Sequence, residues 1–243
     1  GVYCGGAAVF HVATKVKEKL LETAGRIMKE HPYQLELLLD EERGQGVVYA
    51  KGFHQKNMTI GEIAKHAQIY SWGTMQYADS YRQKNCPPCF TTHFVEVDVN
   101  TRTGEITIPR VLIYGDCGTV MNPGLLDGQL IGSFNRGLGY TLYEDLPFDA
   151  AKGRLSNRGL LVDYKLPTAC EMPAAYQVIV RHAHTYEPSG PFGAKGIGEA
   201  ALASVQAAIA NAIYNAVGIR FYKLPITPEV MLQALKAHGL AAK

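Results

Sequence analysis

The sequence predicts an α+β fold in which helices pack on a mixed or antiparallel sheet. Three observations support this prediction. Apolar residues recur at helical spacing over residues 6–30, and charged residues fill the opposite face. Apolar and polar residues alternate over residues 92–113, a pattern typical of a β-hairpin. An alanine-rich segment over residues 200–217 predicts a further helix, which Gly218 ends.

Local signals predict the other elements. Thr59 and Glu62 form a capping box, and Asn122 and Thr227 each precede a proline, as helix caps often do. The expected elements, in chain order, are strands over 34–39 and 46–51, a helix over 59–69, an irregular loop over 70–89, a helix from 122 that carries four glycines, a polar turn over 148–153, strands over 160–166 and 176–182, and a helix over 227–239.

Composition excludes several functional classes. The 243 residues are 47% hydrophobic and can bury a substantial core, which we expect to form one unit with a soft division near residue 90. The net charge of +2 comes from dispersed charges and indicates no nucleic-acid partner. No apolar run approaches the roughly 20 residues of a membrane span, and no secretory signal is recognisable. We therefore expect a cytoplasmic protein without a membrane partner.

Three possible sites are rejected on spacing. The five cysteines are an odd number and suit a reducing compartment, and the lone pair Cys86 and Cys89 lacks the second pair that a zinc site needs. A calcium loop over residues 98–104 fails because its glycine falls one position late. His182, His184 and Asp163 have no serine in a nucleophile elbow to complete a hydrolase triad.

The best candidate for chemistry is the stretch G-P-F-G-A-K-G-I-G-E over residues 190–199. Its glycines allow a ligand or another backbone to approach closely, and Glu199 is expected in the first turn of the following helix, where unpaired N–H groups form a positive pole. The residues alone leave a second interpretation open, because glycine loops often precede helices and a first-turn Glu is ordinary capping chemistry. Neither the dinucleotide fingerprint nor the P-loop is present.

This string resembles the loop that carries the active-site glutamate in the molybdenum hydroxylases, the xanthine dehydrogenase and aldehyde oxidoreductase family. Three further strings occur in the order and approximate spacing of that family: D-C-G-T-V-M-N-P from residue 116, G-Q-L-I-G-S-F-N-R-G-L-G from residue 128, and D-Y-K-L-P-T from residue 163. The resemblance implies that residues 1–243 are the C-terminal part of the family's molybdopterin-binding region, cut from upstream segments. The opening without Met agrees with that expectation.

The resemblance also implies roles for individual residues. Glu199 is the base that takes a proton as oxygen derived from water attacks an electron-poor carbon of a purine, another N-heterocycle or an aldehyde. No protein side chain is expected to ligate the metal. Lys195 either supplies a cation to the cofactor or pairs with an acid at the surface. The expected cofactor contacts are Gln129, Gly193, Ala194, Lys195, Gly196 and Gly198.

Cofactors and partners follow from the same resemblance. It implies molybdopterin, in its cytosine dinucleotide form, carrying molybdenum, with [2Fe-2S] clusters and FAD on partner domains or subunits. The remainder of the molybdenum subunit, iron–sulfur and flavin subunits, a small-molecule substrate and an oligomeric assembly are the expected partners. Two alternatives stay open: a reductase of the hydroxybenzoyl-CoA type, and a non-catalytic piece that completes a site on another chain. Produced alone, the chain is expected to hold no cofactor.

Overall fold

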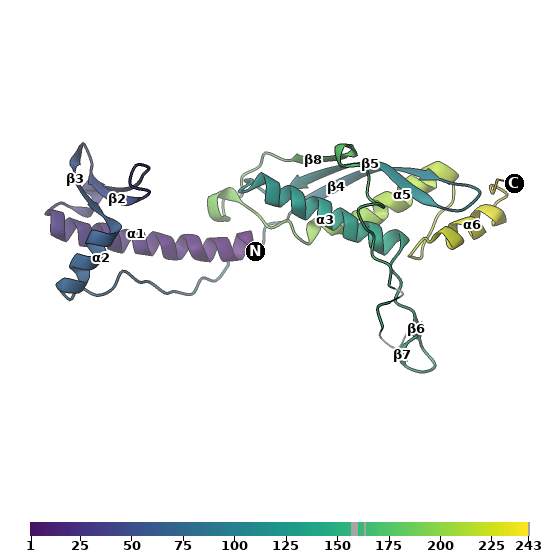
Figure 1. The fold of residues 1–243 in the computed structure, drawn as a ribbon, viewed down its shortest axis with the longest axis horizontal. Coiled ribbons are helices and arrows are strands. Elements are labelled where there is room, and N and C mark those ends of the chain that lie inside the picture. The colour runs from purple at the N-terminus through teal and green to yellow at the C-terminus, as the bar shows by residue number, and fades with distance from the viewer. Residues whose placement is uncertain (157–159, 163, 243) are drawn as a thin grey trace. The chain divides into compact units, whose positions relative to one another are not determined.

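The computed structural model describes residues 1–156, 160–162 and 164–242 and confirms the α+β class. The chain forms two compact units, Gly1–Cys86 and Pro87–Lys243. Each has its own sheet and its own apolar core. Figure 1 shows the helices and strands of both.

The first unit is a three-stranded antiparallel meander with two helices. Its elements are a π-helical turn Val2–Gly6, α1 (Ala7–Met28), a 3₁₀ turn Pro32–Gln34, β1 (Leu35–Asp40), β2 (Gln45–Ala50), β3 (Phe53–Thr59) and α2 (Ile60–Ile69). The capping box is confirmed: the Thr59 N–H donates to the Glu62 carboxylate at 2.8 Å, and the Glu62 N–H donates to Thr59 Oγ1 at 3.2 Å. The core consists of Leu20, Ala24, Met28, Leu35, Val48, Ala50 and Ile63.

The second unit contains the mixed sheet. Its elements are β4 (Phe90–Val99), β5 (Ile106–Asp116), α3 (Pro123–Leu142), β6 (Phe148–Asp149), β7 (Arg154–Leu155), 3₁₀ turns Ala175–Gln177 and Pro191–Gly193, β8 (Val178–His182), α4 (Ala200–Ala203), α5 (Val205–Val217) and α6 (Pro228–Ala237). β4 and β5 form the predicted antiparallel hairpin. β8 pairs with β5 in parallel, so that Gly115 lies opposite His182.

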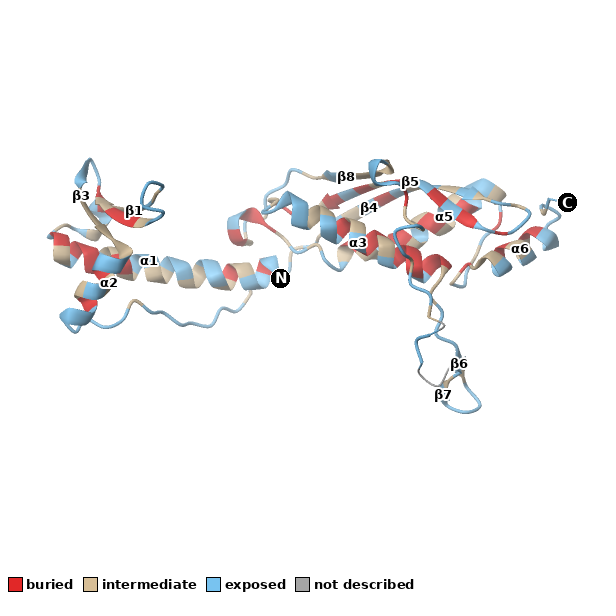
Figure 2. Ribbon diagram, viewed as in Figure 1, coloured by how far each residue is buried: buried red, intermediate tan, exposed pale blue. Residues whose placement is uncertain are grey.

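One face of this sheet is covered by helices and the other faces outward. Along β5, Ile106, Ile108, Val111 and Ile113 are buried, and the residues between them are exposed or, at Leu112, half-buried. Figures 1 and 2 show α3 and α5 on the covered side, with buried residues where they meet the sheet. A Cβ atom at Gly137 of α3 would lie 2.5 Å from the Val205 Cβ of α5. Glycine at this position therefore lets the two helices approach closely.

Three expected elements differ, wholly or in part, from the structure. The strand predicted over 160–166 does not form in its described residues; Asp163 lies outside them. Within the polar turn predicted over 148–153, residues 148–149 form the two-residue strand β6, which pairs with the two-residue strand β7. The helix predicted over 200–217 is broken at Ser204 into α4 and α5. Gly218 ends α5 with a φ of 72°, as predicted.

The segment Ala200–Val217 also corrects the expectation about apolar runs. Its 18 residues have a mean hydropathy of 1.3, so by length and composition it is the one helical stretch among the described residues that could cross a membrane. Four of its residues instead lie in the core of the second unit: Ala201, Val205, Ile209 and Ile213.

Candidate functional site

The loop over residues 190–199 lies beside the segment that follows β5. Three backbone contacts join them: a β-bridge between Gly118 and Ala194, a 2.8 Å bond from the Thr119 N–H to the Gly193 carbonyl, and a 2.7 Å bond from the Lys195 N–H to the Cys117 carbonyl. The two motifs at 116–123 and 190–199 therefore form one unit of structure. The first half of the loop is held by backbone pairing.

Gly193 serves this pairing. Its φ is 84°, and a Cβ atom there would overlap the ring of Tyr186 and the hydroxyl of Thr119. Gly118 has a φ of 67°, and its Cβ would overlap the carbonyl of Gly193. Both glycines and Ala194 are buried. Close packing inside the protein thus explains glycine at 193.

The Lys195 side chain forms a nearly buried ion pair. Its Nζ lies 2.7 Å from Asp116 Oδ2 and 3.0 Å from the carbonyl of Pro88, and the two side chains are 8% and 16% exposed. Thr185 Oγ1 and the Gly118 N–H donate to Asp116 Oδ1 at 2.5 and 3.1 Å. Burial raises the pKa of Asp116, but hydrogen bonds from Lys195, Thr185 and Gly118 outweigh it, so the net pKa is lowered. Lys195 was expected either to supply a cation to the cofactor or to pair with an acid at the surface. In the structure it pairs with Asp116, which is mostly buried.

The second half of the loop is open. Ile197 packs against the core of the second unit, while Gly196 and Gly198 are exposed, and a Cβ atom at either would meet nothing. The N–H groups of Gly196, Ile197 and Gly198 donate no hydrogen bond to any other residue that the structure describes. Backbone donors beside glycines suit a polar group of molybdopterin, since that cofactor carries a phosphate. These residues fit the cofactor that the motifs imply.

Glu199 directly precedes α4, one position earlier than predicted. It is exposed, and its side chain makes no capping hydrogen bond to the helix, although its carbonyl accepts a 3.2 Å bond from the Leu202 N–H. The structure therefore gives the carboxylate no part in capping α4. The ordinary capping interpretation loses its physical basis.

Gln129 lies in the second turn of α3 and is exposed. One turn later, the buried Ser133 places its Oγ 3.5 Å from the carbonyl of Gly198. Residues four apart share one face of a helix, so Gln129 belongs to the side of α3 that meets the loop. Figure 1 shows the start of α3 at the same end of the second unit as this loop. Gly128 and Gly132 have open space where a Cβ would be.

Several residues of this region were not among the predicted site residues. Asp116 is the first residue of the motif D-C-G-T-V-M-N-P, so the sequence did carry a signal for it. Thr185, Thr91 and Ser133 carry no recognisable signal, because each acts through one hydroxyl on a distant segment.

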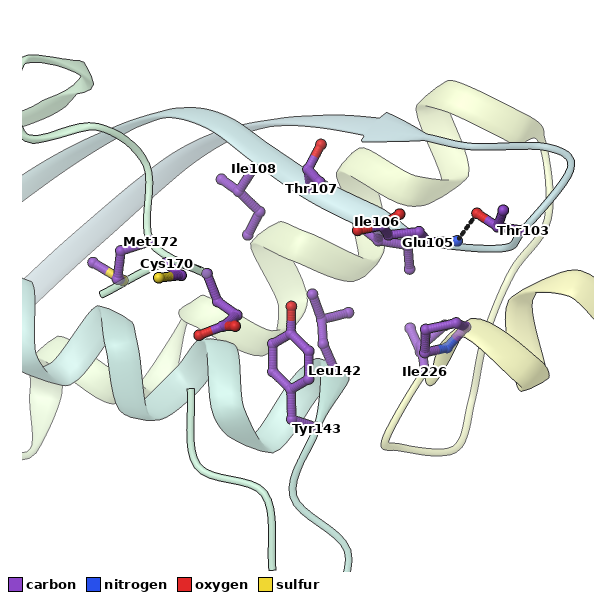
Figure 3. Close-up of a pocket in the computed structure, with 12 residues that line it drawn as sticks. Thr103, Glu105, Ile106, Thr107, Ile108, Leu142, Tyr143, Cys170, Met172 and Ile226 are labelled. Carbon is purple, nitrogen blue, oxygen red and sulfur yellow. Dashed lines mark hydrogen bonds between the residues drawn. The ribbon is translucent and has the colours of Figure 1, made fainter. Parts of the chain in front are cut away.

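A separate cavity of about 450 Å³ lies near the far end of the hairpin and contains none of the predicted site residues. Figure 3 shows the Tyr143 side chain among its lining residues, which also include Glu105, Cys170 and Met172. Burial raises the pKa of Tyr143, and the carboxylates of Glu171 and Glu105 add to the effect.

Comparison with known proteins bears on this geometry. Residues 1–173 match the molybdopterin cofactor-binding domain family. The xanthine dehydrogenase molybdenum-binding subunit of Escherichia coli O157:H7 is 30% identical over 240 residues, which cover 98% of this chain. The aldehyde oxidoreductase molybdenum-binding subunit PaoC of Escherichia coli K12 is 39% identical over 177 residues, or 73% of the chain. The chain spans 31% and 23% of the lengths of these two relatives.

A solved structure agrees with the family match and with the two relatives. The reconstituted CO dehydrogenase from Oligotropha carboxidovorans superposes with a TM-score of 0.82 and 25% identity, covering 98% of this chain and 29% of its own. The resemblance drawn from the four motifs is thus confirmed. Because the family match covers residues 1–173 and the relatives extend the likeness through the Glu199 loop, this chain belongs to the molybdopterin cofactor-binding domain family, with the molybdenum-binding subunits of xanthine dehydrogenase and aldehyde oxidoreductase.

Proposed function

We propose that this chain is part of a molybdenum hydroxylase that adds oxygen from water to an electron-poor carbon, and that Glu199 is its base. One observation carries the proposal. The exposed Glu199 carboxylate ends a loop whose first half is locked to the strand β5 and whose second half presents free N–H groups. A base must be held in place and remain accessible, and Glu199 meets both conditions.

Of the six residues expected to contact the cofactor, three are proposed to bind it directly and three to support them. Gly196 and Gly198 offer backbone N–H groups to its polar end, and the Gln129 amide offers a donor and an acceptor. Gly193 and Ala194 act indirectly, because they are buried in the backbone pairing. The Lys195 ammonium is engaged by Asp116, so this residue serves the site by fixing the loop.

The bound cofactor would supply the metal centre at which the substrate carbon is oxidised. The residues of this chain would do the rest. Glu199 accepts the proton released as the water-derived oxygen bonds to carbon. A glutamate suits this step because its carboxylate oxygens can accept a proton and are exposed here, and an ordered loop would hold them near the reacting atoms.

Substrate and assembly are proposed at the level that the relatives support. The substrate is a purine, another N-heterocycle or an aldehyde. A xanthine dehydrogenase-like reaction is favoured because that relative is 30% identical over 98% of the chain, whereas the CO dehydrogenase structure is 25% identical over the same share. We propose the cytosine dinucleotide form of molybdopterin, with [2Fe-2S] and FAD on partner subunits in a cytoplasmic oligomer. Residues 1–243 would form the C-terminal part of the cofactor-binding region, and the rest of the molybdenum subunit would complete the site.

Two alternative functions lead to different measurements. In a reductase of the hydroxybenzoyl-CoA type, electrons would run towards the substrate. As a non-catalytic piece, the chain would only shape a site on another chain. This alternative is kept because the chain spans 31% of the length of its relative.

Metal and nucleotide analysis of the assembled enzyme, with and without this chain, tests whether the chain is a non-catalytic piece. Substrate-dependent reduction of a dye distinguishes a hydroxylase from a reductase. Loss of molybdenum with the chain and dye reduction by a purine or aldehyde would support the proposal. Full molybdenum and turnover without the chain would refute it.

A further inference from the structure

Two side chains at the start of β4 point to the same face of the sheet, towards the break between α4 and α5. Alternate residues of a strand share a face, and Thr91 and His93 are half-buried and buried, while Thr92 between them is exposed. Both inward residues contact the segment that begins at Glu199. Strand β4 thus meets this segment through polar side chains as well as apolar ones.

The hydrogen bonds form a chain. Thr91 Oγ1 donates to the carbonyl of Ala200 at 2.6 Å, so the residue next to Glu199 is tied to the sheet. Ser204 Oγ donates to the Thr91 carbonyl at 3.5 Å, and His93 Nδ1 lies 2.8 Å from the same Oγ. The 2.8 Å contact between His93 Nδ1 and Ser204 Oγ is the shorter of the two, and either atom can be its donor, depending on the tautomer of the ring.

The surroundings of the His93 ring favour a lasting hydrogen bond to Ser204. It is 8% exposed, and its ring stacks near Phe134 with the centroids 6.0 Å apart. Burial lowers the pKa of His93 to about 4, so the ring is neutral at physiological pH. A neutral ring that donates from Nδ1 has no proton on Nε2, and Nε2 makes no hydrogen bond to the described residues. The bond to Ser204 therefore persists across the pH range in which the enzyme would work.

The break at Ser204 lies where these bonds are made. Residues 200–217 are rich in alanine and would favour one continuous helix. Ser204 instead has φ −101° and ψ −3°, and α4 ends before it. The contacts of Ser204 with Thr91 and His93, and of Thr91 with Ala200, tie both ends of α4 to strand β4. Loss of these contacts would leave α4, and Glu199 directly before it, less firmly held.

We propose that Thr91, His93 and Ser204 are positioning residues for Glu199. They set the direction of α4 and hold the carbonyl next to Glu199, while the Lys195 ion pair holds the loop four residues earlier. The backbone on both sides of Glu199 is thereby held in place. This inference rests on the proposed function only in so far as it concerns turnover; the ordering of residues 196–204 stands independently.

The test uses Thr91→Val and Ser204→Ala in the complete enzyme. Valine has the shape of threonine without the hydroxyl, so Thr91→Val removes the bond to Ala200 with little change in packing. Thr92→Val is the matched control, because it makes the same substitution one residue along on the exposed face. Amide hydrogen exchange of residues 196–204, kcat, KM and molybdenum content are measured for each variant.

We expect exchange of the hydrogen-bonded amides of Ala201 and Leu202 to accelerate about tenfold in both test variants, the factor that loss of one typical hydrogen bond gives. kcat should fall by about tenfold to 100-fold with KM and molybdenum content within about twofold, since small displacements of a catalytic group have this effect. Ser204→Thr, which keeps the hydroxyl, should restore most of the kcat. Thr92→Val should match the unmodified enzyme in every measurement.

Unchanged exchange in both test variants would overturn the proposal. Faster exchange with unchanged kcat would also overturn it, provided that Glu199→Gln is inactive. If Glu199→Gln retains turnover, the base assignment fails instead, and the exchange result still decides whether this network orders the segment. Should Ser204→Ala fail to fold, Thr91→Val decides alone.

Discussion

Lys195 Nζ and Asp116 Oδ2 lie 2.7 Å apart, and little of either side chain reaches solvent. They join the loop that carries Glu199 to the end of β5, across 79 residues of sequence. A buried pair contributes little net stability compared with apolar residues, but removing one partner leaves an uncompensated charge. The pair therefore makes the loop position sensitive to either residue.

Asp116→Ala should lower the free energy of unfolding of the protein by about 3 kcal/mol, because the Lys195 ammonium would remain buried without its partner. Urea denaturation monitored by circular dichroism measures this change. The control is Glu96→Ala, which breaks the Arg110 pair on the same sheet, where both side chains are about half exposed. The control should cost less than about 1 kcal/mol. Equal effects of the two substitutions would show that burial of the Lys195 pair has no energetic importance.

Glu199→Gln should reduce turnover of the complete enzyme by about 10²–10⁴-fold, because the amide keeps the shape of the side chain but cannot accept the proton. Molybdenum content should stay the same, since the substitution leaves the loop backbone in place. Steady-state dye reduction and metal analysis on the same preparation measure both. Glu41→Gln, in an exposed turn of the first unit, is the control and should be silent. Near-normal turnover with full molybdenum would exclude Glu199 as the base.

Gln129→Ala should weaken retention of the cofactor more than it slows chemistry in the molecules that keep it. The expected cause is loss of an amide on the side of α3 that meets the loop. Molybdenum content before and after extended dialysis, with turnover expressed per molybdenum, separates the two effects. Gln68→Ala removes a similarly exposed helical amide from α2 as a control. If occupancy survives dialysis unchanged, Gln129 has no part in binding.

His93 should make the protein less stable in mild acid. Its pKa is lowered by burial from an ordinary 6.5 to about 4, so between these values the unfolded chain binds a proton that the folded chain does not. Stability therefore falls as pH falls through this window, by up to about 3 kcal/mol from this residue.

The measurement is urea denaturation at several pH values between 7 and 4, with His93→Asn compared with the unmodified protein. Asparagine keeps an N–H donor near the position of Nδ1 but does not titrate, so the pH dependence should flatten. His54→Asn is the control, because His54 is exposed and pairs with Glu36 at the surface. A slope that is identical in the His93 variant and the unmodified protein would contradict the lowered pKa.

Helix ends and the central hairpin could be predicted from the sequence because their signals are local. Thr59 and Glu62 form the capping box within one turn, and the Asn122 side chain accepts from the Leu125 N–H as its place before Pro123 suggested. β3 could not be predicted, because its sequence F-H-Q-K-N-M-T has no alternation, and it is a strand only through pairing with β2.

The candidate site divides in the same way. The position of Glu199 at the start of a helix could be read from the sequence to within one residue. The break at Ser204 could not, since it depends on His93, 111 residues away. The partner of Lys195 was equally hidden, because nothing local connects it to Asp116.

This dependence on distant partners sets an order of events during folding. The side-chain bonds that hold residues 195–204 to β4, β5 and α3 link positions between 65 and 113 residues apart. Closing such long loops costs entropy before the contacts repay it, so these bonds form late. In a newly synthesised chain, the segment that carries Glu199, the proposed base, therefore becomes ordered only after β4 and β5 have paired and the residues beyond 204 have left the ribosome. Cofactor insertion would have to wait for that stage, which makes it a natural checkpoint for assembly.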